Sequence, residues 1–411
     1  MTTDVATQVL KAIDVQCALN REHLPSSTSS TAYLLVDITP SGVNIPSGRL
    51  RINSCLLIDS SGSMYGKKLK NAKEGAKEFF DYFKSSDYVA VISFEAKPHL
   101  IVEGQHITDK DHIKSKIDSI KLGSRTFMYT GLQKAFKEIL NLQFTEIGQG
   151  LDPVRRLILL SDGKPTDGVS ISKYKELAKD MRKEGITITC IGIGDYDERY
   201  LQALADNSGG RWYHIKSPED IKTLFNDEFG DMKTVVAPNT SLVIRHPTIA
   251  EVGKIYKSQP TFGEVTNSER AENEIKIPLS DLKRGKTQQI VVEIGLTPKI
   301  EGQFRIAEVI LKGYGATNPH NVVVTFTSNP ELYQRESFPL PAQIYREAAT
   351  RTHILNALDG DKQAKKALKT IIASKAPLAS ETVAMGTEIL DKGAFTPDKT
   401  KEMKQKTQIN R

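Results

Sequence analysis

The chain has 411 residues, enough for two or three domains that each bury a core. Hydrophobic residues make up 39% and charged residues 26%, as in ordinary globular proteins. The net charge of +6 is mild for this length and dispersed along the chain, which argues against nucleic acid as a partner. No apolar stretch approaches the ~20 residues of a membrane-spanning helix, and residues 1–20 hold no signal-peptide block. We therefore expect a cytoplasmic protein without a membrane span.

The three cysteines, Cys17, Cys55 and Cys190, are odd in number and form no C-x-x-C pair. Cys55 and Cys190 lie within apolar runs that are typical of strands. We expect both thiols to be buried, reduced and unreactive. Nothing in this pattern requires an oxidising compartment.

The N-terminal segment, residues 1–48, is expected to hold two strands, at 14–19 and 33–39. Two strands alone bury too little surface to be stable. Partners are available in residues 233–335, where runs of alternating apolar and polar residues are separated by Pro and Gly turns. We interpret that segment as an antiparallel β-sandwich that takes up the N-terminal strands. The residues between the two segments are then an inserted domain.

Residues 49–232 alternate between strands and helices. Strands are expected at 52–58, 88–94, 99–102, 157–160, 186–191 and 212–215. The helix expected at 67–83 repeats its apolar residues with a spacing of ~3.6, so one of its faces packs on a sheet. This alternation predicts a doubly wound, Rossmann-like α/β fold with a mostly parallel sheet. Ligands of such folds bind beyond the carboxyl ends of the strands.

The C-terminal segment, residues 336–411, predicts a small α-helical domain. Helical periodicity of apolar residues occurs at 344–358, 364–372 and 383–389. The basic tail, 399–411, contains no aromatic residue, and we expect it to be a frayed terminus.

The most informative motif is Asp59-Ser60-Ser61-Gly62-Ser63, which follows the apolar run 52–58 and precedes the first long helix. Asp59, Ser61 and Ser63 carry oxygen atoms at every second residue of a strand-to-helix turn. A turn of this kind can aim all three at one point. Oxygen-only ligands suit Mg²⁺ or Mn²⁺ rather than Zn²⁺ or copper.

A second carboxylate, Asp162, follows the buried strand expected at 157–160. Between the two carboxylates, residues 123–126 form a Gly-Ser-Arg-Thr loop that leads into a helix. The strands expected at 52–58 and 157–160 are each followed by a carboxylate, and the carboxyl ends of parallel strands meet at one edge of a sheet. We therefore expect the two carboxylates to lie in the same site.

In order and in residue type, these motifs resemble the von Willebrand factor A (vWA) domain and its metal-ion-dependent adhesion site. The pattern of that family is D-x-S-x-S, followed by Thr and then Asp, and the resemblance covers roughly residues 52–230. Ser161 stands where many members carry Thr. The resemblance implies that five residues hold the metal: Asp59, Ser61, Ser63, Thr126 and Asp162. The order of sandwich strands, vWA-like domain, further sandwich strands and helices is similar in layout to that of COPII coat subunits, which is an analogy of layout only.

The charge of this ligand set indicates its use. Two carboxylates and three neutral hydroxyls leave a bound Mg²⁺ electrophilic and with an open coordination position. We expect a non-enzymatic protein-interaction module in which an Asp or Glu side chain of a partner protein completes the coordination of Mg²⁺ (or Mn²⁺).

Side chains beside the metal loops are expected to form a contact rim: Met64, Tyr65, Phe127, Tyr129 and Lys164. The rims of docking sites are rich in Tyr, Met and Phe. The apolar members of this set can equally point inward as packing residues at helix starts. Spacing alone leaves both arrangements open.

Several alternatives stay open. Asp59 and Ser63 can act as caps of a helix, and Asp162 as the cap of a turn. The metal site can be vestigial or purely stabilising in a structural assembly subunit. A metal-assisted hydrolase is a further class, although no histidine adjoins the metal loops. Neither 62–68 nor 192–194 completes a phosphate-binding or dinucleotide-binding motif. The partner and the oligomeric state stay undetermined.

Overall fold

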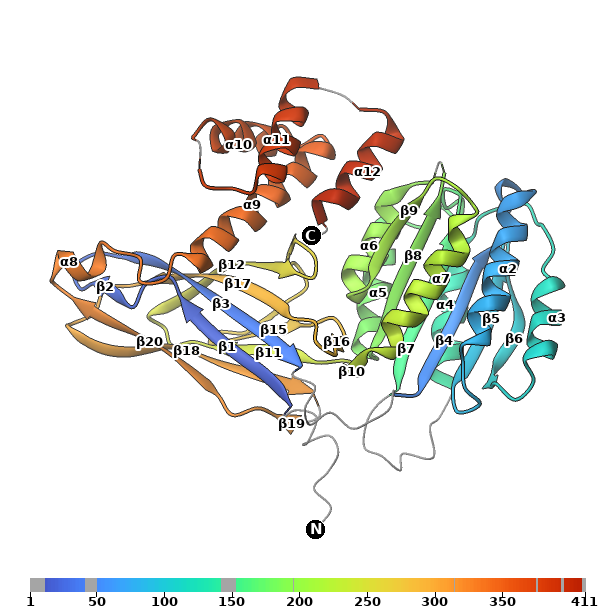
Figure 1. Cartoon of the computed structure of the whole chain (residues 1–411), viewed down its shortest axis with the longest axis horizontal. Coiled ribbons are helices and arrows are strands. Elements are labelled where there is room, and N and C mark those ends of the chain that lie inside the picture. The colour runs from blue at the N-terminus through green and yellow to red at the C-terminus, as the bar shows by residue number, and fades with distance from the viewer. Residues whose placement is uncertain are drawn as a thin grey trace, which may run out of the picture. The chain divides into compact units, whose positions relative to one another are not determined.

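The computed structural model describes residues 12–40, 50–141, 153–194, 196–313, 315–374, 376–392 and 395–408. The chain divides into two compact units (Figure 1). Pro46–Asn239 form the first, which we call the α/β unit. The second, which we call the split unit, consists of two separate stretches, Met1–Ile45 and Thr240–Arg411. Within the described ranges, no helix has both the length and the apolar character needed to cross a membrane.

A six-stranded sheet runs through the α/β unit. In spatial order its strands are β6 (Pro98–His106), β5 (Tyr88–Phe94), β4 (Ile52–Asp59), β7 (Val154–Ser161), β8 (Ile186–Ile193) and β9 (Arg211–Ile215). Neighbouring strands pair in parallel, except that β6 is antiparallel to β5. The chain begins in the middle at β4, builds outward to β6, and returns at β7 to build the other side. β4 and β7 are therefore neighbours at the point where the winding changes direction, which is where ligands of such sheets bind.

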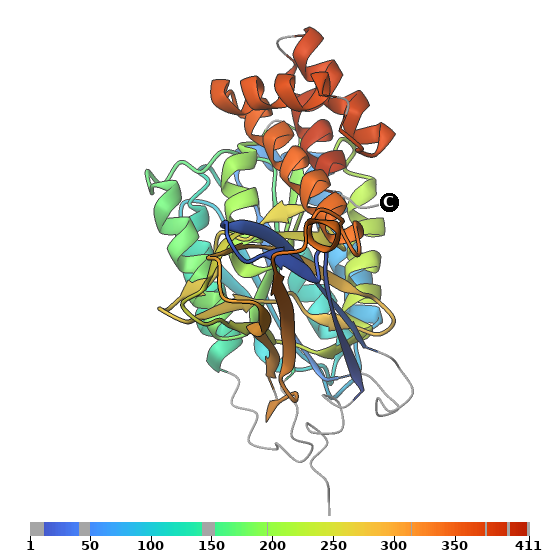
Figure 2. The ribbon, with the colours of Figure 1, turned by 90° about the vertical axis from the view of Figure 1, so that its left-hand side faces the viewer.

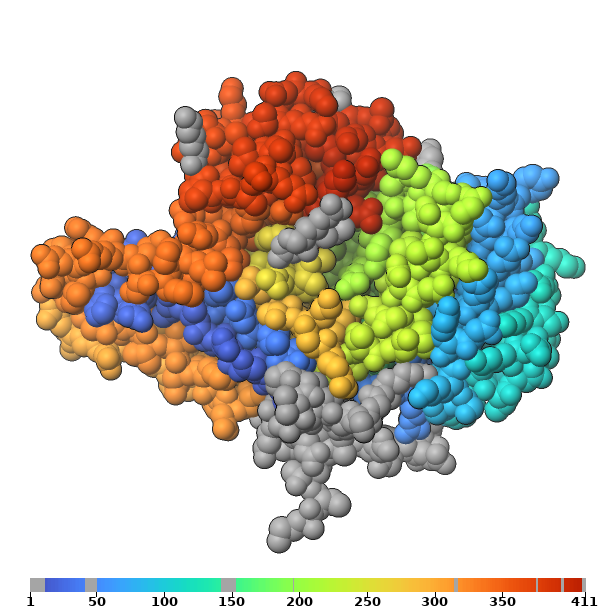
Figure 3. Space-filling model, in the orientation of Figure 1, coloured from blue at the N-terminus to red at the C-terminus, as the bar shows by residue number. Residues whose placement is uncertain are grey.

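Helices cover both faces of this sheet, which confirms the doubly wound α/β fold. One face carries α2 (Lys67–Asp81), α3 (Lys110–Asp118) and α7 (Asp220–Lys233), and the other carries α4 (Met128–Asn141), α5 (Ile171–Lys183) and α6 (Glu198–Ser208). The face with α2, α3 and α7 is turned to the viewer in Figure 3. Because the sheet is covered on both sides, all eight residues of β4 are buried. Leu56 packs toward α2 and α7, whereas its neighbour Leu57 packs toward α4.

The split unit contains two sheets. The smaller has the order β1 (Ile13–Leu19), β3 (Ser30–Pro40), β17 (Gln288–Leu296), β12 (Ala250–Gln259) and β13 (Gly263–Glu264). The larger has the order β14 (Glu269–Arg270), β15 (Glu274–Pro278), β11 (Ser241–Arg245), β18 (Gly302–Gly313), β20 (His320–Thr327) and β2 (His23–Pro25), with β19 (Gly315–Ala316) beside β18. Of the two remaining short strands, β16 (Leu282–Lys283) lies in the split unit, whereas β10 (Val235–Ala237) belongs to the α/β unit.

The N-terminal strands pair with strands that lie after the α/β unit in the sequence. β3 is antiparallel to β17, with Val36 opposite Ile290. On its other side β3 pairs with β1, also in antiparallel register. β2 departs from the antiparallel pattern, since it runs parallel to β20.

Helices end the split unit: α8 (Pro330–Tyr333), α9 (Leu340–Leu358), α10 (Lys362–Ala373), α11 (Ser380–Lys392) and α12 (Pro397–Gln408). The long helix α9 extends from the sheets to the other helices (Figure 2). Near its start, Tyr345 contacts the rings of Tyr33 and Tyr256, with centroids 4.5 and 5.2 Å apart. Toward its end, Ile354 joins Leu368 and other apolar residues in a separate core. The helices therefore have a small core of their own.

The expectation of a frayed basic tail is wrong for its described part, because α12 covers residues 397–408. Lys401 and Lys404 of this helix are buried. The Lys404 ammonium lies 2.5 Å from Asp359 Oδ1. A paired ammonium on a long alkyl stem can be buried, so a helix with little apolar sequence still packs.

Candidate metal centre

Asp59 ends β4 and begins the turn that leads through a short 3₁₀ helix, η1 (Gly62–Met64), into α2. The Ser61 backbone N–H donates to Asp59 Oδ1 at 2.8 Å. Gly66 has a φ of 79°, the left-handed conformation that lets the chain turn into α2. The hydroxyls of Ser61 and Ser63 lie 3.1 Å apart. The turn thus gathers three oxygen-bearing side chains beyond the end of β4.

Asp162 directly follows Ser161, the last residue of the neighbouring strand β7. The Ser63 hydroxyl donates to Asp162 Oδ1 at 2.7 Å and joins the loops that follow β4 and β7. The Ser161 hydroxyl donates to Asp59 Oδ2 at 2.5 Å. Ser161, the residue that departs from the family pattern, therefore links the end of one strand to the carboxylate of the other.

Asp59 is fully buried, at 0% exposure. Burial raises the pKa of its carboxyl group to about 6, against hydrogen bonds from Ser161 and Ser61 that lower it, and the negative charge of Asp162 raises it further. In the described part of the chain, the hydrogen-bond partners of Asp59 are neutral donors and it forms no ion pair. The site therefore holds a negative charge that the described residues do not balance.

Thr126 lies on a third loop, residues 123–127. The Gly123 backbone N–H donates to the Ser60 carbonyl at 2.6 Å, which anchors this loop to the first one. The backbone of Thr126 exchanges hydrogen bonds of 2.9 and 3.0 Å with Thr166, which anchors it to the loop after β7. Thr126 is buried by these contacts.

Gly163 keeps a small space open between the three loops. A Cβ atom at this position would lie 3.1 Å from Thr126 Oγ1 and 3.5 Å from Ser63 Oγ. The hydroxyls of Thr126 and Ser63 therefore flank the same space beside Asp162. Together with Asp59 and Ser61, they form an oxygen-only set of the kind that Mg²⁺ takes. Across the described ranges, no group of three or more His, Cys, Asp or Glu side chains is arranged to hold a metal.

Lys68, near the start of α2, is a component of this site that the sequence did not reveal. Its ammonium contacts Asp162 Oδ2 and lies 3.4 Å from the backbone carbonyl of Ser63. In the sequence, Lys68 stands only as the last residue of 62–68, which do not complete a phosphate-binding motif. A run of lysines at the start of a surface helix gives no signal that one of them reaches a strand end.

The expected rim is only partly found at the surface. Tyr65 is 80% exposed, and Lys164 is exposed as well. Met64 was expected on the rim, which is wrong, because its side chain is fully buried among apolar residues under α2. The short helix η1 turns Met64 inward and its neighbour Tyr65 outward. Phe127 and Tyr129 are half-buried, and the ring of Tyr129, at the start of α4, packs on the core residue Tyr174 of α5.

Two exposed residues near the third loop were missed. Leu122 is among the exposed large apolar side chains of the described chain. Arg125 is exposed, and its guanidinium lies 5.9 Å from the centre of the Phe127 ring. Arg125 directly precedes Thr126 and Leu122 lies just before the loop, and this closeness to a candidate ligand is the signal that the sequence did contain. The surface beside the candidate ligands therefore combines apolar, aromatic and basic side chains.

Comparison with known proteins agrees with this geometry. Residues 55–227 match the family model of the von Willebrand factor type A domain. The chain therefore contains a vWA domain. It is 24% identical over 307 residues to an uncharacterised protein of Synechocystis sp., a match that covers 73% of this chain and 70% of that protein. It is 28% identical over 207 residues to human inter-alpha-trypsin inhibitor heavy chain H2, which covers 49% of this chain and 22% of that protein.

Solved structures show a likeness that extends beyond the vWA domain. A von Willebrand factor type A protein from Catenulispora acidiphila has a TM-score of 0.75 at 16% identity, covering 97% of both chains. The ArnB paralog VWA2 from Sulfolobus acidocaldarius has a TM-score of 0.63 at 16% identity, covering 97% of this chain and 98% of its own. Human COPII-coat protein Sec24c has a TM-score of 0.57 at 14% identity, covering 89% of this chain and 58% of its own. At these identities the likeness concerns the fold alone.

Proposed function

We propose that this chain is a non-enzymatic protein-interaction module that binds its partner through Mg²⁺ or Mn²⁺. The observation that carries the proposal is the meeting of Asp59, Ser61, Ser63, Thr126 and Asp162 at the switch point of the sheet. Capping of helices and turns accounts for some of these side chains singly. It does not account for hydroxyls and carboxylates from three loops that are joined to one another.

The residues of the site have separate tasks in this proposal. Asp59 and Asp162 supply the negative charge, and the hydroxyls of Ser61, Ser63 and Thr126 complete a neutral part of the ligand set. Ser161 holds the Asp59 carboxylate in place by its hydrogen bond. Bound there, a divalent cation supplies positive charge and an open position for a carboxylate oxygen. The partner is therefore a protein that presents an Asp or Glu side chain.

The exposed surface beside the site favours the same class of partner. Tyr65 offers a large ring for contact, and such residues are frequent at the centre of interfaces. Arg125 and Lys164 are exposed basic side chains on two of the three loops. Basic side chains around a docking point steer an acidic segment toward it and disfavour a basic one.

We further propose that the vWA domain, residues 49–232, is an insertion in a β-sandwich made of residues 1–48 and 233–335, with a helical domain at 336–411. The pairing of β3 with β17 supports this arrangement, because it ties the two ends of the sandwich sequence together. The sandwich and helices then act as a frame or as a second contact surface. We also propose a cytoplasmic location for the protein.

Calorimetric titration of Mg²⁺ and of Mn²⁺ into metal-free protein tests the function. We expect saturable binding by the wild type and none by Asp162→Ala, with unchanged binding by Asp118→Asn, which alters an exposed carboxylate elsewhere in the same unit. A partner search with Mg²⁺ against chelator follows from that result. If neither the wild type nor a folded variant of Lys68 binds either metal, the chain is instead a structural assembly subunit with a vestigial site.

A further inference from the structure

Lys68 brings a cation of the chain itself to one of the candidate metal ligands. Its ammonium contacts Asp162 Oδ2, while the other oxygen of that carboxylate accepts the hydrogen bond from Ser63 at 2.7 Å. The Asp162 side chain has 0% exposure, whereas the Lys68 side chain is 32% exposed. The ammonium therefore reaches a buried carboxylate from a side chain that still contacts solvent.

This contact changes the charge balance of the site. Asp59 and Asp162 contribute −2 and Lys68 contributes +1, which leaves −1 for the three side chains. A divalent cation added to all three gives +1, whereas the same cation gives 0 when the ammonium is absent. Positive charges at short distance in a poorly solvated site repel strongly. The metal and the Lys68 ammonium therefore compete for the same carboxylate, that of Asp162.

We propose that Lys68 sets the metal affinity of the site by competing with the metal for Asp162. The inference rests on the proposed metal-dependent function. Without metal, the ammonium neutralises Asp162 and holds it in place. On metal binding, the ammonium gives up its contact with Asp162 but stays beside the site. Lysine suits this task, since its compact charge sits on a flexible stem and can leave, unlike a bidentate arginine.

A consequence for the partner follows from the same charges. The site loaded with metal carries a net positive charge as long as Lys68 stays near, and a carboxylate ligand brings that charge back to zero. Metal retention then depends on an acidic partner more strongly than it would without Lys68. Lys68 therefore lowers the affinity of the site for the metal alone, and it increases the gain in metal affinity that a partner carboxylate provides.

Calorimetric titration of Mg²⁺ into Lys68→Met and wild type tests the competition. We expect the dissociation constant of Lys68→Met to be at least about tenfold lower than that of the wild type, because the competing cation of a buried carboxylate is gone. Lys70→Met is the matched control, since it removes the same charge from an exposed residue of the same helix whose ammonium lies 4.0 Å from Glu74. Its affinity is expected to stay within about twofold of the wild type, as exposed charges are screened by salt.

Thermal unfolding provides a readout that metal affinity alone does not. In chelator, Lys68→Met is expected to unfold at a lower temperature than the wild type, because Asp162 loses its cation. Addition of Mg²⁺ is expected to raise the unfolding temperature of Lys68→Met by more than that of the wild type. A purely structural role of Lys68 predicts the loss of stability in chelator without any gain in metal affinity.

A second variant, Lys68→Gln, keeps a polar side chain in case Lys68→Met does not fold. The inference is overturned if folded variants bind Mg²⁺ no more tightly than the wild type. Binding by the variants when the wild type binds none supports it, since removal of the ammonium then opens the site. If wild type and both variants all fail to bind Mg²⁺ and Mn²⁺, the proposed function fails and the inference fails with it.

Discussion

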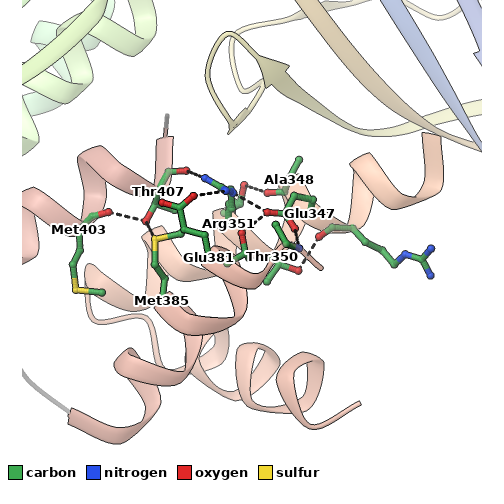
Figure 4. Close-up of polar contacts among 12 residues, drawn as sticks. Glu347, Ala348, Thr350, Arg351, Glu381, Met385, Met403 and Thr407 are labelled. Carbon is green, nitrogen blue, oxygen red and sulfur yellow. Dashed lines mark hydrogen bonds and ion pairs between the residues drawn. The ribbon is translucent and has the colours of Figure 1, made fainter. Parts of the chain in front are cut away.

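Two regions of this chain bury charge, and they balance it differently. In the C-terminal helices, Arg351 is 4% exposed and is paired within the chain (Figure 4). Its guanidinium lies 2.9 Å from Glu347 and 3.8 Å from Glu381, and it donates to the Thr407 carbonyl at 3.1 Å. It also stacks over the Phe262 ring at 4.3 Å. Each of its three nitrogen atoms therefore faces an oxygen atom, and the plane of the guanidinium lies over an aromatic ring.

The candidate metal centre lacks such a balance. Asp59 is as deeply buried as Arg351, but among the described residues its contacts are neutral hydrogen-bond donors. Asp162 has Lys68 as a cation, from a side chain that is one-third exposed. A charge that its own chain neutralises fixes structure, whereas a surplus of buried negative charge fits a site that takes a cation from outside.

The largest expected effect is on stability, and it comes from the removal of Arg351, the cation whose charge the chain balances. Arg351→Met should lower the free energy of unfolding by about 3–5 kcal/mol, because it leaves the Glu347 carboxylate, whose side chain is only 14% exposed, without its cation. Urea denaturation of the metal-free protein measures this change. Arg346→Met, an exposed arginine one turn earlier in α9, is the control and should stay within about 0.5 kcal/mol of wild type. A small effect of Arg351→Met would show that its contacts are not needed to hold the helices together.

For Asp59, the carboxylate that the chain does not balance, we expect substitution to raise the free energy of unfolding rather than lower it. Asp59→Asn should raise the free energy of unfolding in chelator by about 1–2 kcal/mol at pH 7.5, because it removes a buried charge while keeping the shape. The same variant should bind no Mg²⁺, so addition of Mg²⁺ should stabilise only the wild type. Denaturation with and without Mg²⁺ measures both effects. Destabilisation of Asp59→Asn in chelator would show that the Asp59 charge is compensated after all.

The pH dependence of stability should reveal Asp59 in the metal-free protein. Its pKa is about 6 when folded and close to 3.8 when unfolded, so between these values the folded state binds more protons. Protonation of Asp59 therefore favours folding, and its stabilising effect is full below about pH 4 and is lost as the pH rises through 6. The difference in unfolding free energy between wild type and Asp59→Asn, measured from pH 4 to 8 in chelator, isolates this group. A difference that does not vary with pH would contradict the raised pKa.

The smallest expected effect comes from the space that Gly163 keeps open. Gly163→Ala should weaken Mg²⁺ binding by about tenfold with little change in stability, because its Cβ would crowd the hydroxyls of Thr126 and Ser63. Gly230→Ala is the control, since no atom lies within 4 Å of a Cβ at that helical position. Calorimetry with Mg²⁺ compares the two. Wild-type affinity in Gly163→Ala would mean that the metal lies elsewhere among the loops.

The sequence predicted those parts of the site that depend on strand ends. The apolar runs before Asp59 and Asp162 mark buried parallel strands, and adjacent parallel strands bring their carboxyl ends together. Burial of Cys55 and Cys190 was also confirmed, because both lie in apolar runs that form buried strands of this sheet. What failed depends on side-chain direction. Met64 was expected outside but lies inside, because one residue of a tight turn decides which side a chain faces.

Two further features that the sequence did not predict involve lysine. Lys68 acts through a long flexible stem that crosses from one loop to another, and no local pattern reports such a reach. In α12, Lys404 is buried against Asp359, so hydrophobic periodicity missed a helix that packs with charged residues. Both cases are paired ammonium groups whose partners lie far away in the sequence.

Location of Mn²⁺ by anomalous diffraction from crystals of the wild-type protein grown with the metal tests the central claim most directly. The account predicts a peak within ~2.5 Å of the hydroxyl oxygens of Ser61 and Ser63, at the end of β4 and β7. It also predicts the loss of that peak in Asp59→Asn crystals grown under the same conditions. If crystals grown with saturating Mn²⁺ show no anomalous peak at these loops, or show the peak at another part of the chain, the account is contradicted.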